Sequence, residues 1–253
     1  MDAPFNVLGV RVSALSMTDA VETIGGWIRD RRREYVCVRD VHGIMACTRD
    51  TALCQIHNGA GMVTPDGMPL VWVGRWYRRE IERVCGPDLL PAVCAASRDW
   101  KHYFYGGGPG VPERLAQRLI DRHGPLSVVG TCSPPFRELS AEEDEEIVRR
   151  INDARPDVVW VGLGTPKQEQ WMASHRARLH APVLIGVGAA FDFHAGVKRQ
   201  APRWIRHSGF EWCFRLATEP RRLWKRYLHN NPLFVYQLAL QLLGDRRGGS
   251  RSA

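Results

Sequence analysis

Residues 61–70 read Gly-Met-Val-Thr-Pro-Asp-Gly-Met-Pro-Leu and combine three local signals. A short apolar strand leads into a Pro-Asp-Gly turn, and an apolar helix is expected to follow the turn. In an open α/β sheet such a turn places one carboxylate, Asp66, at the carboxyl edge of the sheet, where ligands bind. The stretch also fits an ordinary surface turn, because Pro-Asp-Gly is common turn chemistry. The rest of the chain has to decide between these two interpretations.

The same alternation of strand, turn and helix continues along most of the chain. Short apolar runs alternate with amphipathic segments of about 10 to 15 residues, a pattern typical of βαβ units and a mostly parallel sheet. We expect strands at Tyr35–Val38, Gly61–Thr64, His102–Tyr105, Leu126–Gly130, Val158–Val161 and Val183–Val187. We expect a helix that begins near Met17, with its cap at Ser16 or Thr18, and helices over Gly43–His57 and Ala141–Ala154. A further helix is expected to be capped by Asp88 and to end near Ser97, another to end near His123, and another to begin at Pro166.

The composition is that of an ordinary globular protein and excludes several classes. Of the 253 residues, 44% are hydrophobic and 25% are charged. The seven cysteines form no Cys-x-x-Cys pair, so we expect neither a zinc site nor a disulfide framework, and a reducing cytosol fits. The first residues lack the pattern of a signal peptide, and no apolar run reaches the roughly 18 residues of a membrane span.

The excess of basic over acidic side chains lies entirely in the C-terminal fifth of the chain. The formal net charge of the chain is +8, and the residues from Lys198 onward include twelve Lys and Arg against three Asp and Glu. The first 197 residues hold 23 basic against 24 acidic side chains and are nearly neutral. This asymmetry predicts an anionic partner for the tail, namely nucleic acid, phosphates or a membrane surface.

Three segments follow from this change of character. We predict an α/β catalytic domain over residues 1–197, a basic amphipathic appendage over 198–244 and a disordered tail over 245–253. Within the appendage, Trp and Arg are interleaved, and residues 230–232, Asn-Asn-Pro, are expected to break the chain before the apolar segment Leu233–Leu243. A basic, Trp-rich helix followed by a short apolar one is typical of a membrane-surface element. Packing of the segment on the core or on a second subunit fits equally well.

Two glycine-rich loops each lie between an expected strand and an expected helix. Gly106, Gly107 and Gly108 open the loop to Gly110 between a strand and a helix, where backbone N–H groups can cradle phosphate. The loop is neither a dinucleotide fingerprint nor a Walker loop, and a tight structural turn is the alternative. At the second junction, Thr165 and Gln168 form a Thr-x-x-Gln capping box with Pro166 at the first helical position. Gly164, Lys167, Gln168 and Glu169 cluster there at the mouth of a helix.

Other polar residues are expected at the same sheet edge. Asp192 follows a strand that ends in small residues, and its carboxylate could accept hydrogen bonds from a ribose or a base edge; a loop cap is the alternative. Asp40 and His42 close the first strand of the predicted sheet. No Gly-x-Ser-x-Gly elbow points to a serine nucleophile, and no Asp-x-Asp pair is present to chelate a metal–nucleotide diphosphate.

The ordered set of motifs resembles the WecG/TagA/CpsF glycosyltransferases over about residues 5–227. Each motif is weak alone, but seven in order are specific. They are Thr64-Pro-Asp-Gly-Met68, Gly106–Gly110, Gly130-Thr-Cys-Ser-Pro-Pro-Phe136, Gly164-Thr-Pro-Lys-Gln-Glu-x-Trp171, Gly188-Ala-Ala-Phe-Asp-Phe-x-Ala-Gly196, Arg199-x-Ala-Pro-x-Trp204, and Gly209-Phe-Glu-Trp-Cys-Phe-Arg-Leu216 with the Glu219–Tyr227 segment.

The resemblance implies a Rossmann-like α/β core, a basic helical C-terminal appendage and no metal requirement or other cofactor. It further implies an inverting transfer from a UDP-sugar to a polyprenyl-diphosphate-linked acceptor at the cytoplasmic face of the membrane, in cell-surface or exopolysaccharide synthesis. Asp66 matches the proposed general base, which would take the proton of the acceptor hydroxyl. Basic positions proposed to meet the diphosphate match Arg215, Arg222, and Lys225 or Arg226.

One departure from the family pattern and two competing functions stay open. Many members carry Thr-x-Asn where this chain has Val38-Arg39-Asp40, so the donor sugar cannot be carried over from the N-acetylmannosaminyl members. A non-catalytic nucleotide-binding scaffold of polysaccharide assembly is the alternative. Nucleic-acid binding by the basic tail is disfavoured, because its arginines lie among Trp and Leu and no known motif is present. The sequence does not decide between a monomer and a homo-oligomer.

Overall fold

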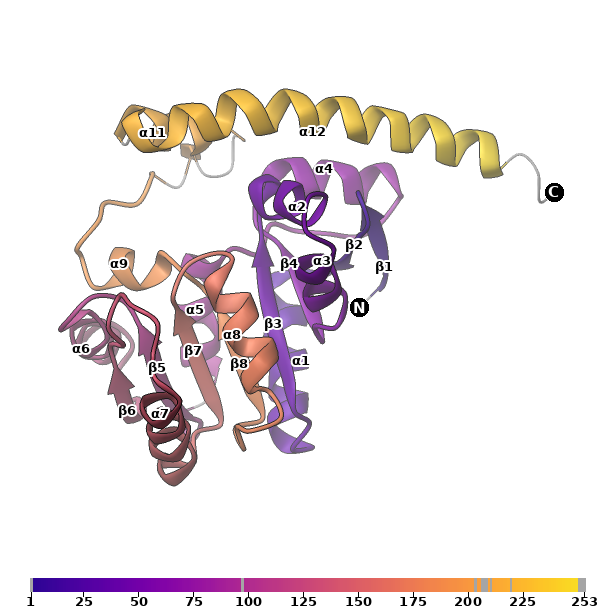
Figure 1. Ribbon diagram of the computed structural model, residues 1–253. Helices are drawn as coiled ribbons and strands as arrows, with labels where there is room; N and C mark the ends of the chain where they lie inside the picture. Colours follow the sequence, from indigo (N-terminus) through magenta and orange to yellow (C-terminus); the bar gives the residue numbers. More distant parts are fainter. Residues whose placement is uncertain are drawn as a thin grey trace.

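Six parallel strands form the centre of the fold: β3 (Glu34–Arg39), β4 (Met62–Pro65), β5 (Lys101–Gly106), β6 (Ser127–Cys132), β7 (Val158–Gly162) and β8 (Val183–Gly186). Their order in the sheet is β4-β3-β8-β7-β5-β6 (Figure 1). The computed structural model describes residues 2–96, 98–202, 204–205, 209, 211–218 and 220–249. The α/β class and the parallel sheet predicted from the sequence are confirmed.

Helices cover both faces of this sheet. Successive strand side chains point to opposite faces, so Val36 and Val38 enter one core and Cys37 enters the other. Burial on both faces explains why these strands are continuous apolar runs rather than alternating ones. The first face is covered by α1 (Met17–Arg29), α5 (Gly86–Ala96), α6 (Val111–His123) and α9 (Ala190–His194), and the second by α2 (Val41–Cys47), α3 (Thr51–Asn58), α7 (Ala141–Ala154) and α8 (Lys167–His175).

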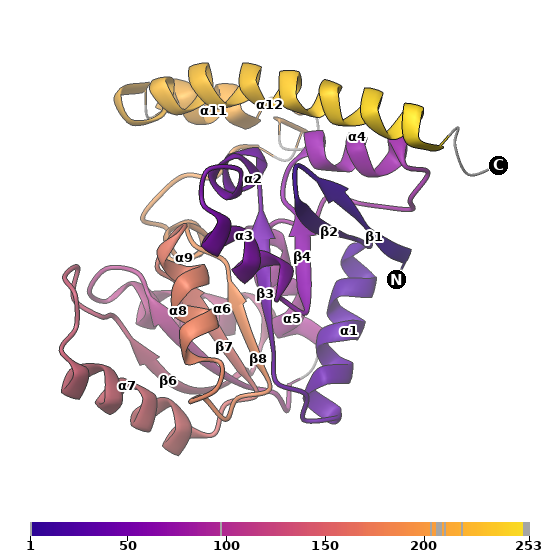
Figure 2. The same cartoon turned by 45° about the vertical axis from the view of Figure 1, so that its right-hand side comes forward.

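An antiparallel hairpin protects the edge strand β4. The hairpin consists of β1 (Asp2–Val7) and β2 (Val10–Ala14), and Ser13 Oγ accepts a hydrogen bond from the Val63 backbone N–H at 3.1 Å. Figure 2 shows the hairpin between β4 and the helix α4 (Met68–Trp76), which follows the Pro-Asp-Gly turn. Covering this edge removes the unpaired strand that would otherwise invite aggregation.

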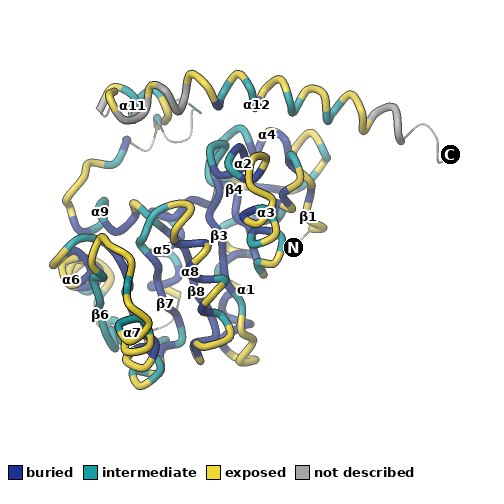
Figure 3. Tube along the Cα trace, viewed as in Figure 1, coloured by how far each residue is buried: buried dark blue, intermediate teal, exposed yellow. Residues whose placement is uncertain are grey.

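The C-terminal appendage is helical and lies across one end of the domain. It contains α11 (Glu211–Thr218) and α12 (Pro220–Gly249), and α12 passes over α2 and α4 (Figures 1 and 2). The expected break at residues 230–232 is wrong, because α12 continues through Pro232. The helix also extends to Gly249, beyond the expected start of the tail at residue 245. Most of its outward surface is exposed (Figure 3).

Two helix boundaries differ from the sequence expectation for local reasons. The segment expected as one helix from Gly43 to His57 is two helices, because Asp50 caps the second through the Leu53 N–H at 2.9 Å. Asp88 lies inside the first turn of α5 rather than at its cap. The predicted cap Ser16 is confirmed, with a reciprocal capping box to Asp19.

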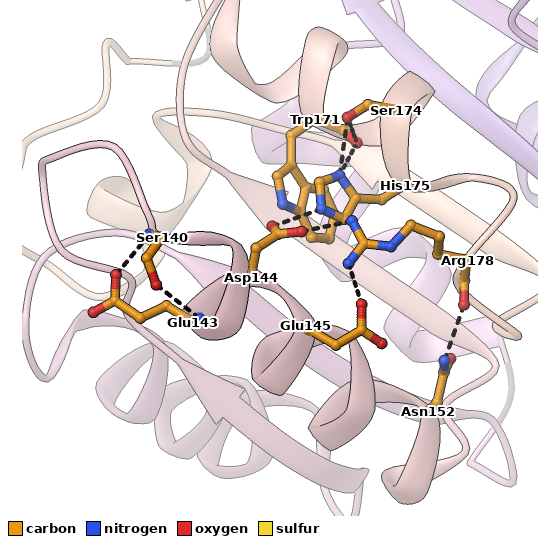
Figure 4. A network of polar contacts seen from close by, with 9 residues as sticks. All are labelled: Ser140, Glu143, Asp144, Glu145, Asn152, Trp171, Ser174, His175 and Arg178. Carbon is orange, nitrogen blue, oxygen red and sulfur yellow. Dashed lines mark hydrogen bonds and ion pairs between the residues drawn. The ribbon is translucent and has the colours of Figure 1, made fainter.

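A polar network joins α7 to the end of α8 (Figure 4). Asp144 accepts hydrogen bonds from His175 Nε2 at 2.8 Å and from Arg178 at 2.5 Å, while Glu145 pairs with Arg178 at 2.7 Å. The acidic run at the start of α7 therefore anchors the neighbouring helix. The anchoring fixes the orientation of α8, whose first residues lie at the carboxyl edge of the sheet.

Candidate active site

Asp66 lies directly after β4, where the chain turns into α4. Gly67 has φ of +133°, which only glycine adopts without strain, and α4 starts at Met68 with a proline in its first turn. The Asp66 backbone N–H donates to the Arg39 carbonyl at 2.6 Å, which holds the turn against β3. The turn predicted from the sequence thus fixes the position of one carboxylate at the sheet edge.

The Asp66 carboxylate is paired with a buried arginine. Arg83 Nη2 lies 3.2 Å from Asp66 Oδ1, and 6% of the arginine side chain and 21% of the aspartate side chain are exposed. The neighbouring positive charge favours the ionised carboxylate, while the exposed fraction leaves it accessible from the cavity described below. Arg83 orients the carboxylate and was not predicted from the sequence.

Asp40 and His42 come from the adjacent strand end. Asp40 caps α2 by accepting the Gly43 N–H at 2.8 Å, so part of its role is structural. His42 lies in the first turn of α2, and its Nδ1 is 2.8 Å from the side-chain nitrogen of Asn230 on α12. Because β3 and β4 are neighbours, both residues are brought to the same place as Asp66.

A cavity of about 460 Å³ connects these polar residues with the appendage. Its floor is polar and contains Asp40, His42, Asp66 and Arg83. Its walls are apolar and come from α4, from the appendage helices and, at Val41, from α2. The wall residues are Val41, Met68, Pro69, Trp72, Val73, Trp76, Trp212, Phe234, Val235, Leu238 and Leu242, with Gly67, Gly209, Asn230 and Asn231 completing the lining. A polar floor beneath apolar walls suits an amphiphilic ligand.

The glycines of residues 106–108 lie at the same edge but outside this cavity. A Cβ at Gly106 would lie 2.6 Å from the Gly162 carbonyl carbon, and the Gly107 N–H donates to the Gly162 carbonyl at 3.0 Å. Close packing of the β5 and β7 ends therefore requires glycine at position 106. Strand β5 leads to α6 on one face and β7 leads to α8 on the other, which makes this a topological switch point. Phosphate binding by Gly106, Gly107 and Gly108 stays a prediction.

The start of α8 differs from the predicted capping box. Pro166 is the N-cap and no side chain caps the helix, while Thr165 Oγ1 accepts a hydrogen bond from Arg39 at 3.0 Å. Glu169 is fully buried in an ion pair with Arg39, and Gln168 donates to Glu169 at 2.7 Å. These contacts join the end of β3 to the first turn of α8 at the carboxyl edge of the sheet. Lys167 is exposed, and neither Lys167 nor Gly164 lines the cavity.

The remaining predicted residues lie in two other places. Asp192, in α9, pairs with Lys198 at 2.8 Å and does not line the cavity. The four basic appendage positions belong to α11 and α12, but their side chains lie outside the described residues: Arg215, Arg222, Lys225 and Arg226. The structure thus brings Asp66, Asp40 and His42 together at one cavity.

Comparison with known proteins now bears on this arrangement. The model of the Glycosyl transferase WecG/TagA/CpsF family matches residues 5–248. The chain belongs to this family. Similar proteins include the N-acetylglucosaminyldiphosphoundecaprenol N-acetyl-beta-D-mannosaminyltransferases of Staphylococcus aureus strains NCTC 8325 / PS 47 and COL. Each is 26% identical over 242 residues, which cover 94% of this chain and 92% of the relative.

Among the described residues of this WecG/TagA/CpsF glycosyltransferase, no group of three or more His, Cys, Asp or Glu side chains is placed to hold a metal ion. Within the same part of the chain, no helix combines the length and apolar character needed to cross a membrane.

Several residues of the candidate site were not predicted from the sequence. Arg83 lies seventeen positions after its partner Asp66, and Asn230 lies 188 positions after His42, so no local pattern signals either pairing. A signal did exist for the cavity wall, because Trp72 and Trp76 are one helical turn apart. Both indoles are about half exposed, at 53% and 51%.

Proposed function

We propose that this glycosyltransferase moves a sugar, with inversion and without a metal ion, from a UDP-sugar to a polyprenyl-diphosphate-linked glycan. The observation that carries the proposal is the cavity in which the paired carboxylate of Asp66 lies beneath apolar walls from α4 and α12. The names of the staphylococcal relatives, which specify a diphosphoundecaprenol acceptor and an N-acetylmannosaminyl group, support the lipid-linked acceptor and an N-acetylhexosaminyl donor. The donor sugar of this chain is left unassigned.

In the proposed reaction, Asp66 acts as the general base. The carboxylate accepts the proton of the acceptor hydroxyl while the hydroxyl oxygen forms a bond to the anomeric carbon. The bond between that carbon and the UDP oxygen breaks from the opposite side, and UDP departs with the electron pair. Arg83, 3.2 Å from the carboxylate, orients the base before it takes the proton.

The donor and the acceptor are proposed to occupy different parts of one edge. Four strand spacings separate β4 from β5, roughly 19 Å, and the switch point between β5 and β7 is where open sheets bind nucleotides. UDP would lie there, with the helix N-termini and the amides near Gly164 and Gly108 opposing its charge. The sugar end would reach towards Asp66. Lys167 and Asp192, at neighbouring strand ends, are candidates for donor contacts.

The appendage is proposed to hold the enzyme on the inner face of the cytoplasmic membrane. Its basic residues would attract anionic headgroups, and Arg215, Arg222, Lys225 and Arg226 would meet the acceptor diphosphate. The outward face of α12 adds an apolar stripe, because Leu228, Tyr236, Leu240 and Leu243 have between 53% and 71% of their surface exposed. The cytoplasmic location follows from the donor class.

The decisive experiment is Asp66→Asn with a UDP-sugar and a soluble analogue of the lipid-linked acceptor. We expect release of UDP to fall by roughly 100-fold or more, because the amide cannot take the proton, while UDP binding measured by calorimetry is retained. Asp121→Asn, at an exposed site on α6, is the matched control and should keep wild-type turnover. Turnover retained in Asp66→Asn would refute the base assignment. Wild-type protein that binds UDP but never releases it from a UDP-sugar would favour a non-catalytic scaffold.

A further inference from the structure

Asn230 joins the appendage to the catalytic domain at the wall of the cavity. The residue is 4% exposed, and its side chain has two partners on or just after α2. Arg49 Nη2 donates to Asn230 Oδ1 at 2.8 Å, and Asn230 Nδ2 lies 2.8 Å from His42 Nδ1. The side chain therefore connects a cation on one side with an imidazole on the other.

These two contacts determine which way the amide faces. Arginine has only donors, so the oxygen of Asn230 must face Arg49 and the amide NH2 must face His42. The NH2 group is a donor, so Nδ1 of His42 can only be the acceptor. A neutral imidazole that accepts at Nδ1 carries its proton at Nε2. The appendage thus selects one of the two tautomers of His42.

His42 is part of the cavity floor together with the catalytic candidate. Its ring lines the same cavity as Asp40, Asp66 and Arg83. A histidine with a protonated Nε2 is a hydrogen-bond donor and cannot accept a proton at that atom. Asp66 is then left as the base, and the imidazole can donate to an oxygen of a bound substrate.

We propose that Asn230 is a positioning residue, which seats α12 and fixes His42 as an Nε2–H donor towards a sugar or phosphate oxygen in the cavity. The inference rests on the proposed transferase function for the identity of that oxygen. It gives the appendage a role in the chemistry, since the donor is set only when α12 lies on α2. The second attachment of α12 is separate: Gln241 accepts from the Leu8 N–H at 2.8 Å and donates to the Asn6 carbonyl at 2.9 Å.

The first test is an NMR measurement of the tautomer of His42 in the full chain, from the two-bond ¹H–¹⁵N correlations of its ring. The His42→Ala variant identifies which ring signals belong to His42. Wild-type protein should show the Nε2–H form at pH 8. Asn230→Asp keeps a partner for Arg49 but removes the donor to Nδ1, so the signals should change to a ring protonated at Nδ1. Gln241→Glu makes the same amide-to-acid change at the other attachment and should leave the tautomer unchanged. An Nδ1–H ring in the wild type, or equal changes in both variants, would overturn the proposal.

The second test is kinetic. Asn230→Asp should lower kcat by roughly tenfold or more with UDP affinity within about twofold of wild type, because the donor acts on the reacting substrate. In the His42→Ala background the same substitution should have no further effect on kcat, since the two residues act as one unit. Additive losses would overturn the proposal. The tautomer measurement needs no turnover, so it separates failure of this inference from failure of the proposed function.

Discussion

Arg39 and Glu169 form an ion pair in which 2% and 0% of the two side chains are exposed. Burial by itself lowers the pKa of Arg39, but the combined electrostatic effect of Glu169 and of the neighbouring Cys37, Asp40 and Cys47 outweighs burial and raises that pKa above its ordinary value. The guanidinium therefore stays charged. The pair joins the end of β3, which precedes Asp40, to the first turn of α8. It sets the relative position of two parts of the candidate site.

Glu169→Gln should destabilise the fold strongly. The substitution preserves size but leaves Arg39 buried without a counter-charge, which costs about 3 kcal/mol or more. Urea unfolding measures the change in the free energy of unfolding. Glu146→Gln is the matched control, because Glu146 pairs with Arg149 at the surface and its loss should cost less than about 1 kcal/mol. Similar losses in the two variants would contradict the structural role of the buried pair.

Gly106→Ala and Gly110→Ala should differ although both glycines have positive φ. The Cβ at residue 106 would meet the Gly162 backbone at 2.6 Å with φ of +126°, whereas nothing lies within 4 Å of a Cβ at residue 110, where φ is +75°. We expect a loss of about 3 kcal/mol for the first and about 1 kcal/mol for the second. Thermal unfolding of both variants checks this. An equal cost would mean that the β5 and β7 ends can separate.

Stability should fall as the pH drops from about 6.5 to about 4. Burial lowers the pKa of His57 and of His102 from 6.5 to about 4 in each case, so the unfolded chain binds more protons than the folded one within this window. Each histidine contributes about 3 kcal/mol at neutral pH that is lost on acidification. Urea unfolding at several pH values measures the slope.

The contribution of His102 to this slope can be isolated. His102 Nδ1 accepts a hydrogen bond from Trp160 at 3.1 Å, so His102→Leu will lower stability at every pH. The variant should also show a flatter dependence between pH 6.5 and 4, because one titrating group is gone. An unchanged slope would show that His102 does not titrate in this range.

The outward face of α12 should be required for membrane attachment. Leu240→Glu/Leu243→Glu replaces two exposed apolar side chains, 53% and 55% exposed, and should reduce flotation with anionic vesicles severalfold. Phe136→Glu/Val197→Glu changes two exposed apolar residues outside the appendage and serves as the control. Neutral vesicles report the apolar contribution alone. Equal flotation of the two double variants would argue that α12 does not face the membrane.

The sequence predicted those features that depend on neighbouring residues. The strands of the sheet, the capped helix after Ser16 and the turn before Asp66 all rest on local periodicity and turn chemistry, and all occur in the structure. Predictions from local sequence patterns were wrong where a residue distant in the sequence makes the contact. Thr165 contacts Arg39 instead of capping α8, and Pro232 is accommodated in a helix that is held by Asn230 and Gln241.

By itself the sequence determined an alternating α/β core, a carboxylate at a strand end and a basic appendage. These depend on the order of apolar, turn-forming and charged residues along the chain. Only the tertiary structure decided that Arg83 pairs with Asp66, that Arg39 pairs with Glu169, and that Asn230 reaches His42. Such pairings join residues 17 to 188 positions apart, and they arise because parallel strand ends converge on one edge while α12 folds back across it.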